Sequence, residues 1–390
     1  MKKGWVHRKL GDICSIERGG SPRPITDYIT DSEDGINWIK IGDATEGSKY
    51  ITSTKEKIKP EGMKKSRFVH KGDFILSNSM SFGRPYILGI DGCIHDGWLV
   101  IHDERSAFIK DYLFYLLSSP FMASKFKQLA VGGVVNNLNS SLVKSVIVPI
   151  PEKEIQQSIA LELDKINELI SLKEKQLKEL DNIAQGLFYE LFGDPVLNEK
   201  GWPVKKLGDI CSIERGGSPR PITDYITDSE DGINWIKIGD ASEKDMYITS
   251  TKEKIKPEGM KKSRFVHKGD FILSNSMSFG RPYILGIDGC IHDGWLVIHD
   301  GNGVFDKVFL YHMLSHPSMY AQFKNMAVGG VVNNLNSKMV RNVKVFVPSH
   351  NHQQSFAKKI ELITAEKKVV LSMIEDLKTL LASRMQYWFE

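Results

Sequence analysis

Residues 152–192 read EKEIQQSIALELDKINELISLKEKQLKELDNIAQGLFYELF, and this stretch decides how the chain is organised. Apolar side chains recur along it in steps of three and four, with one gap at Lys173. This narrow period is typical of a coiled-coil seam rather than of a broad helix face packed on a core. We therefore predict a long spacer helix over residues 152–193. Its seam consists of Ile159, Leu163, Ile166, Ile170, Leu177, Leu180, Ala184, Leu187 and Leu191.

The sequence before this helix is repeated after it. Trp5 corresponds to Trp202, an offset of 202 − 5 = 197 residues, and a second helical run begins near Gln353. The second seam consists of Phe356, Ile360, Ile363, Val370, Ile374, Leu377, Leu381 and Trp388. The predicted domains are a globule at 1–151, a helix at 152–193, a globule at 194–348 and a helix at 349–390.

Each long helix needs a partner for its seam, and the two helices of the chain are the obvious pair. About 40 helical residues span roughly 60 Å. If the helices form an antiparallel coiled coil, the globules lie at opposite ends of a rod, related by an approximate two-fold axis. Lys173 and Lys367 interrupt the two seams at different heptad positions, which would help to fix the register. The alternative is that each helix packs on its own globule or on another chain.

Length and composition fit two globular units joined by helices. The 390 residues are too many for one ordinary core, and 41% hydrophobic with 26% charged residues is typical of soluble proteins. No apolar run approaches the roughly 18 residues that a membrane span needs, and no signal peptide is recognisable. The cysteines Cys14, Cys93, Cys211 and Cys290 lack the close spacing of a zinc or redox motif. We expect buried free thiols in a cytoplasmic protein.

The net charge of +4 permits nucleic-acid binding without requiring it. A local basic cluster is more informative, because it occurs in both copies of the repeat. A solvated face is the simpler interpretation of one such cluster, whereas a duplicated cluster suits a pair of phosphate-contacting surfaces. The cluster consists of Lys55, Lys57, Lys59, Lys64, Lys65, Arg67 and Lys71, repeated at Lys252, Lys254, Lys256, Lys261, Lys262, Arg264 and Lys268.

Each globule is predicted to be a small α+β unit, because several short strands accompany one convincing helix. The helix is expected at residues 111–129, interrupted at Ser119-Pro120. In the first copy, strands are expected before Gly19 and at 36–41, 74–77, 86–90, 97–102 and 145–151.

The two copies diverge unevenly. Between residues 9 and 103 they differ only at Thr45/Ser242, Gly47/Lys244, Ser48/Asp245 and Lys49/Met246, which we interpret as a tolerant loop tip. After residue 103 they diverge, except that residues 130–140 are identical to residues 327–337. Positive backbone φ angles would explain the glycines of this island but not Asn136, Asn137 and Asn139. We therefore favour a functional role for the island.

Two like modules on a two-fold axis suit a ligand that is itself two-fold, and duplex DNA is the standard example. Three loops of the first copy, at 18–24, 77–84 and 131–139, carry the Arg, Asn and Ser side chains that read base edges. Arg23 or Arg84 would pair with guanine, and Asn78, Asn136 or Asn137 with adenine. For any single residue, an ordinary turn is the competing interpretation.

The candidate DNA-binding residues occur in both copies. In the first they are Arg18, Ser21, Arg23, Lys40, Ser77, Asn78, Ser79, Arg84, Gly132, Gly133, Asn136 and Asn137. In the second they are Arg215, Ser218, Arg220, Lys237, Ser274, Asn275, Ser276, Arg281, Gly329, Gly330, Asn333 and Asn334.

The whole chain resembles the specificity subunit of type I restriction–modification systems. The resemblance rests on the order of globules and helices and on local motifs: WxxxKLGD at 202–209, HKGDFILS at 70–77, the GGxxNxLN loop and a helix starting with Gln156-Gln157. It implies that each globule is a target-recognition domain and reads one half of a bipartite DNA site. It also implies that the spacer helices dock two modification subunits, which carry S-adenosylmethionine and methylate adenine N6; a restriction subunit can join them.

This chain departs from the usual family pattern, in which the two recognition domains differ. Because its domains are nearly identical, the resemblance implies that both half-sites have the same sequence in inverted orientation. The target would then be an interrupted palindrome.

The sequence predicts a non-catalytic chain that binds no cofactor and no metal. We find no Asn/Asp-Pro-Pro-aromatic motif, no glycine-rich cofactor loop and no P-loop. His95-Asp96 and His292-Asp293 are interpreted as turns rather than as metal ligands or an acid–base pair. Two other functions stay open: a stand-alone DNA-binding protein and a protein-binding scaffold. Apolar residues outside the seam would form a docking face for a large partner, or else pack on the globules: Leu161, Leu169, Leu172, Phe188 and Tyr189.

Overall fold

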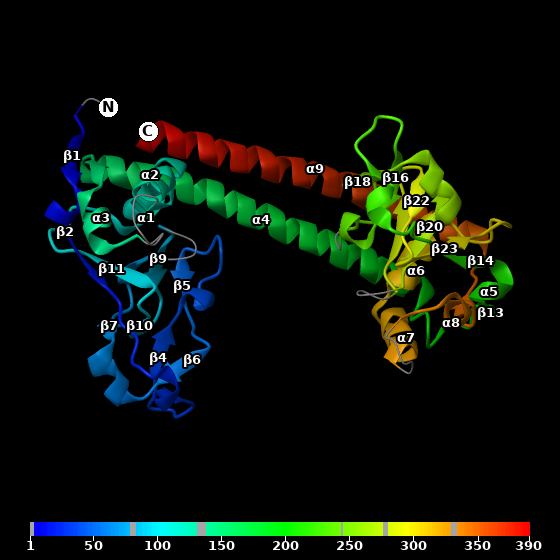
Figure 1. The fold of residues 1–390 in the computed structure, drawn as a ribbon, viewed down its shortest axis with the longest axis horizontal. Helices are drawn as coiled ribbons and strands as arrows, with labels where there is room; N and C mark the ends of the chain where they lie inside the picture. Colours follow the sequence, from blue (N-terminus) through cyan, green and yellow to red (C-terminus); the bar gives the residue numbers. More distant parts are fainter. Residues whose placement is uncertain (1–3, 79–82, 131–137, 243–244, 276–279, 329–333) are drawn as a thin grey trace. The chain divides into compact units, whose positions relative to one another are not determined.

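The computed structural model describes residues 4–78, 83–130, 138–242, 245–275, 280–328 and 334–390. Two compact units divide the chain: the first comprises residues 1–174 and 372–390, and the second comprises residues 175–371. Two helices of 40 residues, α4 (Lys153–Phe192) and α9 (His350–Phe389), each give one half to each unit (Figure 1). Both spacer helices are thus confirmed, and α9 starts one residue after the predicted domain boundary at 349.

Two five-stranded sheets form the body of the first unit, with strand orders β2-β11-β8-β9-β5 and β3-β6-β4-β10-β7. The pairs β5·β9 and β4·β10 are parallel and the other pairs are antiparallel. A separate antiparallel pair joins β1 to β12. The strands are β1 (Val6–Lys9), β2 (Cys14–Arg18), β3 (Ile29–Thr30), β4 (Ile36–Ile39), β5 (Tyr50–Ile51), β6 (Glu56–Ile58), β7 (Arg67–Val69), β8 (Phe74–Ser77), β9 (Pro85–Leu88), β10 (Gly92–Ile94), β11 (Trp98–Asp103) and β12 (Ile147–Ile150).

Alternation along β11 directs its side chains into two different cores of the first unit. In β11, Trp98 and Val100 point into the core between the two sheets, while Leu99 and Ile101 point into the core between one sheet and the helices. Successive strand residues face opposite sides of a sheet, so a strand buried on both faces is apolar throughout. The sheet containing β11 is therefore the middle layer of the unit.

The helices of the first unit are α1 (Lys110–Ser118), α2 (Pro120–Ala130) and α3 (Ser140–Ser145), together with the first half of α4 and the second half of α9. The predicted interruption at Ser119-Pro120 is confirmed, because Pro120 begins α2. The buried side chain of Gln156 fixes the start of α4: its Oε1 accepts from Ile109 N at 2.7 Å, and its Nε2 donates to the Ala107 and Pro151 carbonyls.

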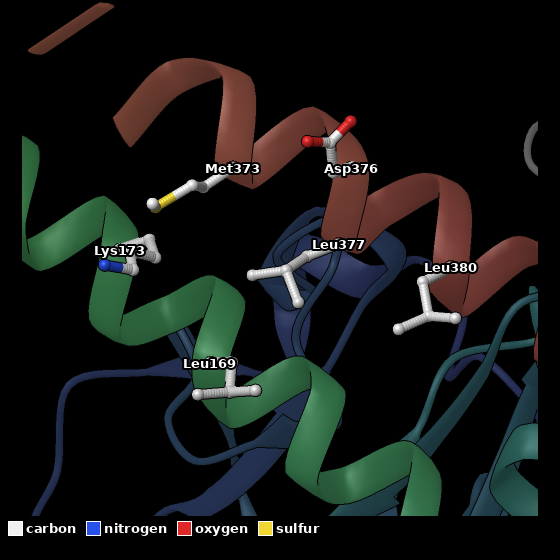
Figure 2. A pocket seen from close by; sticks show the side chains of 6 residues that line it. All are labelled: Leu169, Lys173, Met373, Asp376, Leu377 and Leu380. Atoms are coloured by element: carbon white, nitrogen blue, oxygen red, sulfur yellow. The ribbon is translucent and has the colours of Figure 1, made fainter. Parts of the chain in front are cut away.

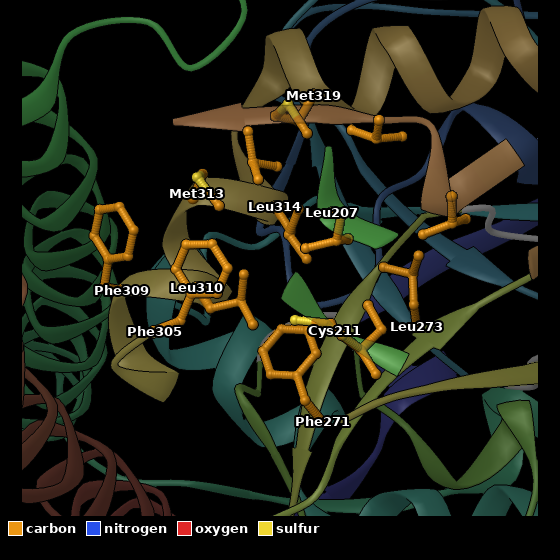
Figure 3. Close-up of a cluster of buried hydrophobic side chains, with 14 of the residues drawn as sticks. Leu207, Cys211, Phe271, Leu273, Phe305, Phe309, Leu310, Met313, Leu314 and Met319 are labelled. Atoms are coloured by element: carbon orange, nitrogen blue, oxygen red, sulfur yellow. The ribbon is translucent and has the colours of Figure 1, made fainter. Parts of the chain in front are cut away.

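The second unit repeats this architecture, with sheets β14-β23-β20-β21-β17 and β15-β18-β16-β22-β19 and the pair β13·β24. Figure 3 shows its largest buried apolar cluster, which includes Leu207, Phe271 and Phe309. Its strands are β13 (Val204–Lys206), β14 (Ser212–Arg215), β15 (Ile226–Thr227), β16 (Ile233–Ile236), β17 (Tyr247–Ile248), β18 (Glu253–Ile255), β19 (Arg264–Val266), β20 (Phe271–Ser274), β21 (Pro282–Leu285), β22 (Gly289–Ile291), β23 (Trp295–His299) and β24 (Lys344–Phe346). Its short helices are α5 (Leu207–Ile210), α6 (Lys307–Ser315), α7 (Pro317–Val328) and α8 (Ser337–Arg341).

The predicted helix seam is correct. Within the first unit, Arg384 Nη2 donates to Glu162 Oε2 at 3.1 Å. Within the second, Lys367 Nζ donates to Asp181 Oδ1 at 2.6 Å. Residues early in α4 thus meet residues late in α9, and the reverse, so the two helices run antiparallel in each unit. The seam residues are buried or half-buried: Leu163, Ile166, Ile170, Leu177, Leu180, Ile360, Ile363, Ile374, Leu377 and Leu381.

The last turns of each long helix complete the core of a globule. In the first unit, Met385 and Phe389 of α9 are buried, and the ring centroids of Phe389 and Tyr112 lie 5.6 Å apart. In the second, Phe188 and Phe192 of α4 are each only 1% exposed. The expectation that Phe188 belongs to a docking face is therefore wrong, because this ring packs into the second globule. The remaining four residues of that predicted face are about half exposed: Leu161, Leu169, Leu172 and Tyr189.

The predicted tolerant loop tip is wrong for its last residue. Lys49 is only 19% exposed, and its Nζ lies 2.5 Å from Asp111 of α1 and 3.1 Å from Asp164 of α4. The Tyr115 hydroxyl donates to the same Asp164 oxygen at 2.6 Å. In the second copy Met246 replaces Lys49 and packs against the apolar core. This position is thus a contact between globule and helices.

The four cysteines are buried free thiols, as predicted. Burial raises the pKa of Cys14 to about 12 and that of Cys93 to about 11, which leaves both as unreactive thiols at neutral pH. In the part of the chain that the structure describes, no helix has the length and apolar character that crossing a membrane requires.

Candidate nucleic-acid interface

The loop after β2 is held against the turn before β11 by a close backbone approach. Gly19 N donates to Trp98 O at 2.9 Å, and Gly20 N donates to Ile94 O at 3.1 Å. A Cβ atom on Gly19 would lie 2.3 Å from the His95 carbonyl oxygen, so only glycine fits there. This approach sets Arg18, Ser21 and Arg23 beside the turn.

Asp96 is the centre on which the first two predicted loops converge. Its Oδ1 accepts from Ser21 Oγ at 2.8 Å, and its Oδ2 lies 3.4 Å from Arg23 Nη2. Its backbone carbonyl accepts from Arg18 Nε at 2.8 Å and from Asn78 Nδ2 at 2.9 Å. The side chains of Arg18 and Arg23 remain 56% and 80% exposed. The cluster therefore holds two arginines in place while leaving both accessible to a ligand.

The electrostatics of the cluster favour an anionic ligand. Burial lowers the pKa of His95 and outweighs the opposing effect of Asp96, so its ring, with Nε2 2.9 Å from Asp96, is neutral at pH 7. Burial alone would raise the pKa of Asp96, but the Ser21 hydrogen bond and the charges of Arg18 and Arg23 hold it below its usual value. One carboxylate thus faces two guanidinium groups, which leaves an excess of positive charge.

The second unit repeats this cluster with nearly the same distances. Ser218 Oγ donates to Asp293 Oδ1 at 2.9 Å, and Arg220 Nη2 lies 3.4 Å from Asp293 Oδ2. Arg215 Nε and Asn275 Nδ2 each donate to the Asp293 carbonyl at 2.9 Å. Both units therefore present the same arrangement of arginine, serine and aspartate.

Four predicted residues of the first copy, Asn78 among them, have partners within the protein. Asn78 and Ser77 are 3% and 1% exposed, and Ser77 Oγ accepts from Arg84 N, so their side chains support the cluster from inside. Lys40 forms an ion pair with Glu56. Arg84 is 45% exposed and lies 2.7 Å from Glu46. In the second copy, Ser274 and Asn275 are likewise buried, and Lys237 pairs with Glu253.

Burial of Asn78 contradicts the expectation that its amide pairs with adenine, since that amide is enclosed by the fold. The third predicted loop meets the same site at one described residue, because Leu138 N donates to Asn78 O at 3.0 Å. Asn139 caps α3 by accepting from Leu142 N, so it needs no functional explanation. In the second copy Asn334 is half-buried. The other predicted residues lie outside the described ones: Ser79, Gly132, Gly133, Asn136, Asn137, Ser276, Gly329, Gly330 and Asn333.

Several lysines of the predicted basic cluster also have partners in the globule. Lys59 Nζ donates to Asp27 O at 2.7 Å, Lys65 bonds to the Tyr28 hydroxyl, and Arg67 Nη1 lies 2.6 Å from Glu17. These contacts stabilise the sheet β3-β6-β4-β10-β7, so the basic cluster is in part structural.

Sequence reasoning missed the role of Asp96 and Asp293. The His-Asp-Gly-Trp motif was interpreted as a plain turn, and its identity in the two copies carried no signal because nearly all of residues 9–103 are identical. Among the residues that the structure describes, no group of three His, Cys, Asp or Glu side chains could hold a metal ion.

The long helices carry exposed apolar residues outside the seam. Figure 2 shows a groove of the first unit, where Leu169 and Lys173 of α4 face Met373 and Leu377 of α9. At the corresponding place in the second unit, Gln176 Nε2 lies 3.4 Å from Glu366 Oε1, so a polar pair stands where the first unit has Met373 and Leu169.

Both modules expose arginines on loops, and arginine side chains are common contacts to DNA phosphates and base edges. The model of the type I restriction modification DNA specificity domain (Methylase_S) matches residues 2–182 and again residues 199–369. The chain therefore belongs to this family of specificity domains, whose role in such systems is DNA recognition and not catalysis.

Named relatives agree with this assignment. The chain is 30% identical over 237 residues to the type I restriction enzyme MjaIX specificity subunit of Methanocaldococcus jannaschii, covering 56% of this chain and 54% of that one. It is 24% identical over 397 residues to the putative MjaX specificity subunit of the same organism, covering 93% of this chain and 87% of that one. The chain thus spans about half of the first relative and most of the second.

The fold is shared with two solved structures. One was determined to explain complex assembly and conformational transition of the type I R-M system; its TM-score is 0.67 at 18% identity, and the match covers 99% of this chain and 97% of that chain. The other is the type I restriction-modification system S subunit from M. genitalium, with a TM-score of 0.55 at 15% identity, covering 99% and 96%.

Proposed function

We propose that this chain reads a bipartite DNA site, with the surface around Asp96 contacting one half and the surface around Asp293 contacting the other. The observation that carries this proposal is the repetition of one cluster in both units, with Ser–Asp distances of 2.8 and 2.9 Å and Arg–Asp distances of 3.4 Å in each. Identical surfaces select identical sequences, so both half-sites would be the same. In inverted orientation they form an interrupted palindrome.

The proposal takes Arg23 and Arg220, which are 80% and 82% exposed, as phosphate contacts, and substitution tests this. Arg23→Ala and Arg220→Ala should weaken DNA binding by similar factors, because the two side chains have equivalent surroundings. Each loss of a phosphate contact should also reduce the slope of log K against log salt by about 1. Fluorescence anisotropy at several salt concentrations measures both quantities.

Arg105→Ala is the matched control. This exposed arginine follows β11 at the end of the strand opposite Asp96 and has Asn302 as its counterpart in the second copy. It should leave the affinity and the salt slope unchanged. Unchanged DNA binding by both Arg23→Ala and Arg220→Ala would contradict the proposed interface.

We further propose that the paired helices dock two modification subunits, which would carry S-adenosylmethionine and methylate adenine; restriction subunits would join that complex. A partner that binds twice needs the same apolar residues twice. Two pairs related by the 197-residue offset satisfy this requirement: Leu172 with Val369, and Leu380 with Ile183, all between 46% and 54% exposed.

Charge substitutions on one unit at a time test this docking. Leu172→Glu with Leu380→Glu changes the first unit, and Val369→Glu with Ile183→Glu changes the second. Each double variant should reduce the number of bound modification subunits from two to one, as measured by native mass spectrometry. Two bound subunits in both variants would exclude this face as the docking site.

A further inference from the structure

A short turn in the first unit lies between two ion pairs that face different parts of the molecule. On one side, Glu46 Oε1 lies 2.7 Å from Arg84 Nη2, one of the candidate DNA-binding residues. On the other side, Lys49 lies between Asp111 of α1 and Asp164 of α4, at 2.5 and 3.1 Å. The turn thus connects the helices to an arginine on the surface of the globule.

The turn itself is held by its own hydrogen bonds. Ser48 N donates to Thr45 O at 3.1 Å, and Ser48 Oγ donates to Tyr50 O at 2.8 Å. Gly47 adopts a φ angle of 82°, which glycine reaches without strain. Lys49 also accepts from Ile87 N at 2.9 Å through its carbonyl, which ties the turn to β9. Such a turn moves as one piece, so fixing Lys49 also fixes Glu46.

The two ion pairs differ in strength. Glu46 is 79% exposed and Arg84 is 45% exposed. An exposed ion pair of this kind does little by itself to fix the orientation of its side chains. Lys49 is 19% exposed, meets two carboxylates, and lies over the rings of Phe114 and Tyr115. The partly buried pair therefore supplies the anchorage that the exposed pair lacks.

We propose that Lys49 is a positioning residue for DNA recognition: anchored on the helices, it holds Glu46, and Glu46 orients the Arg84 guanidinium toward a base. This inference rests on the proposed function, because it takes Arg84 as a DNA contact. Glu46 and Arg84 form a one-to-one pair without the surplus positive charge of the Asp96 cluster, where one carboxylate faces two arginines. Such a neutral pair disfavours phosphate and leaves a directed donor, which suits base reading. The readout that Lys49 should change is therefore discrimination between sequences rather than total affinity.

The experiment measures the ratio of affinities for two 40-base-pair duplexes, using the complex of this chain with its modification subunits. One duplex carries the motif that the complex methylates, and the other has both half-sites scrambled. Arg84→Ala should lower the ratio about tenfold, the loss expected for one bidentate base contact. Glu46→Gln and Lys49→Met should each lower it about threefold, because the guanidinium loses its orientation but not its charge.

Two further variants separate positioning from general support. In the Arg84→Ala background, Lys49→Met should change the ratio no further, since it acts only through that arginine. Lys49→Met combined with Asp111→Val reproduces the Met246 and Val308 pair of the second copy and should recover most of the ratio.

Each outcome decides a different question. If Arg84→Ala leaves the ratio unchanged, its assignment as a DNA contact in the proposed function fails. If Arg84→Ala lowers the ratio and Lys49→Met does not, the positioning role is overturned. It is also overturned if Lys49→Met lowers the ratio by the same factor with and without Arg84.

Discussion

The two units have almost the same sequence on the surface proposed to bind DNA. They differ in the residues that join this surface to the helices. In the first unit, Lys49 contacts Asp111 and Asp164. In the second, Met246 and Val308 stand at the positions of Lys49 and Asp111 and pack against the apolar core. One contact between globule and helices is thus ionic in one unit and apolar in the other.

The backbone above this contact is the same in both units. Ile87 N donates to Lys49 O, and Ile284 N donates to Met246 O, each at 2.9 Å. Deeper in the contact, His312 replaces Tyr115, and its Nε2 has no hydrogen-bond partner among the described residues. Residues from separate segments have therefore changed together while the geometry of the edge strand stayed fixed. A nearly constant surface is thus compatible with either the ionic contact or the apolar contact between globule and helices.

Substitutions at the helix ends that complete the two cores should have the largest effect on stability, and each should act on one unit. Phe188→Ala removes a ring packed among Phe192, Phe309 and Phe356, and should destabilise the second unit by about 4 kcal/mol. Met385→Ala, the corresponding change in the first unit, should cost about 3 kcal/mol, because the side chain is smaller. Hydrogen exchange read separately in each globule measures both. Equal protection losses in both globules for either variant would contradict this division.

The next largest difference should be in stability at low pH, where the second unit should lose more stability than the first. Burial and, to a smaller extent, Lys367 lower the pKa of His312 to about 4, with Asp181 opposing them. The unfolded chain binds a proton there below pH 6.5, whereas the folded unit does not until about pH 4, so stability falls as the pH falls through this window. The loss should reach about 3 kcal/mol by pH 4.

The control for the acid prediction is His312→Phe, which removes the titrating group and keeps the aromatic contact with Phe356. Hydrogen exchange of the second globule between pH 6.5 and 4 should become less dependent on pH in this variant. The same pH dependence with and without His312 would show that another group is responsible.

The smallest effect should come from exchanging the ionic contact for the apolar one. Lys49→Met leaves two carboxylates facing an apolar side chain and should cost the first unit about 2 kcal/mol, less than for a fully buried pair. Adding Asp111→Val should recover more than half of this loss, because the double variant matches the second unit. Denaturant unfolding of the three variants measures the coupling. Additive effects of the two substitutions would indicate that the residues do not act as a pair.

The long-range plan of the fold was predictable, because it rests on strong periodic signals. The seams of α4 and α9 and the 197-residue repeat specified two globules and two antiparallel helices. The interruption at Ser119-Pro120 was also predictable, since proline begins a helix but does not continue one. By contrast β3, β5, β6, β7 and β10 were missed, because strands of two or three residues carry no readable alternation. The strand β1 was also missed, because Val6 is its one apolar residue.

The candidate site was predictable only in part. Two of the loops proposed to bind DNA do converge, but on Asp96, whose role depends on a contact with Ser21 across 75 residues. Burial of Asn78 and Phe188 was likewise invisible, because it depends on packing between distant segments. Identity between the copies could not identify functional residues within 9–103, where supporting and exposed residues are equally unchanged.

The most direct test of the central claim is single-molecule methylation sequencing of DNA treated with this chain and its modification subunits. Two identical recognition surfaces predict adenine methylation at an interrupted palindrome, with the same half-site on both strands. A methylated motif with two unlike halves would contradict the claim that both units read the same sequence. Absence of methylation, with tight DNA binding by the chain alone, would contradict its role as the specificity component of a methylating complex.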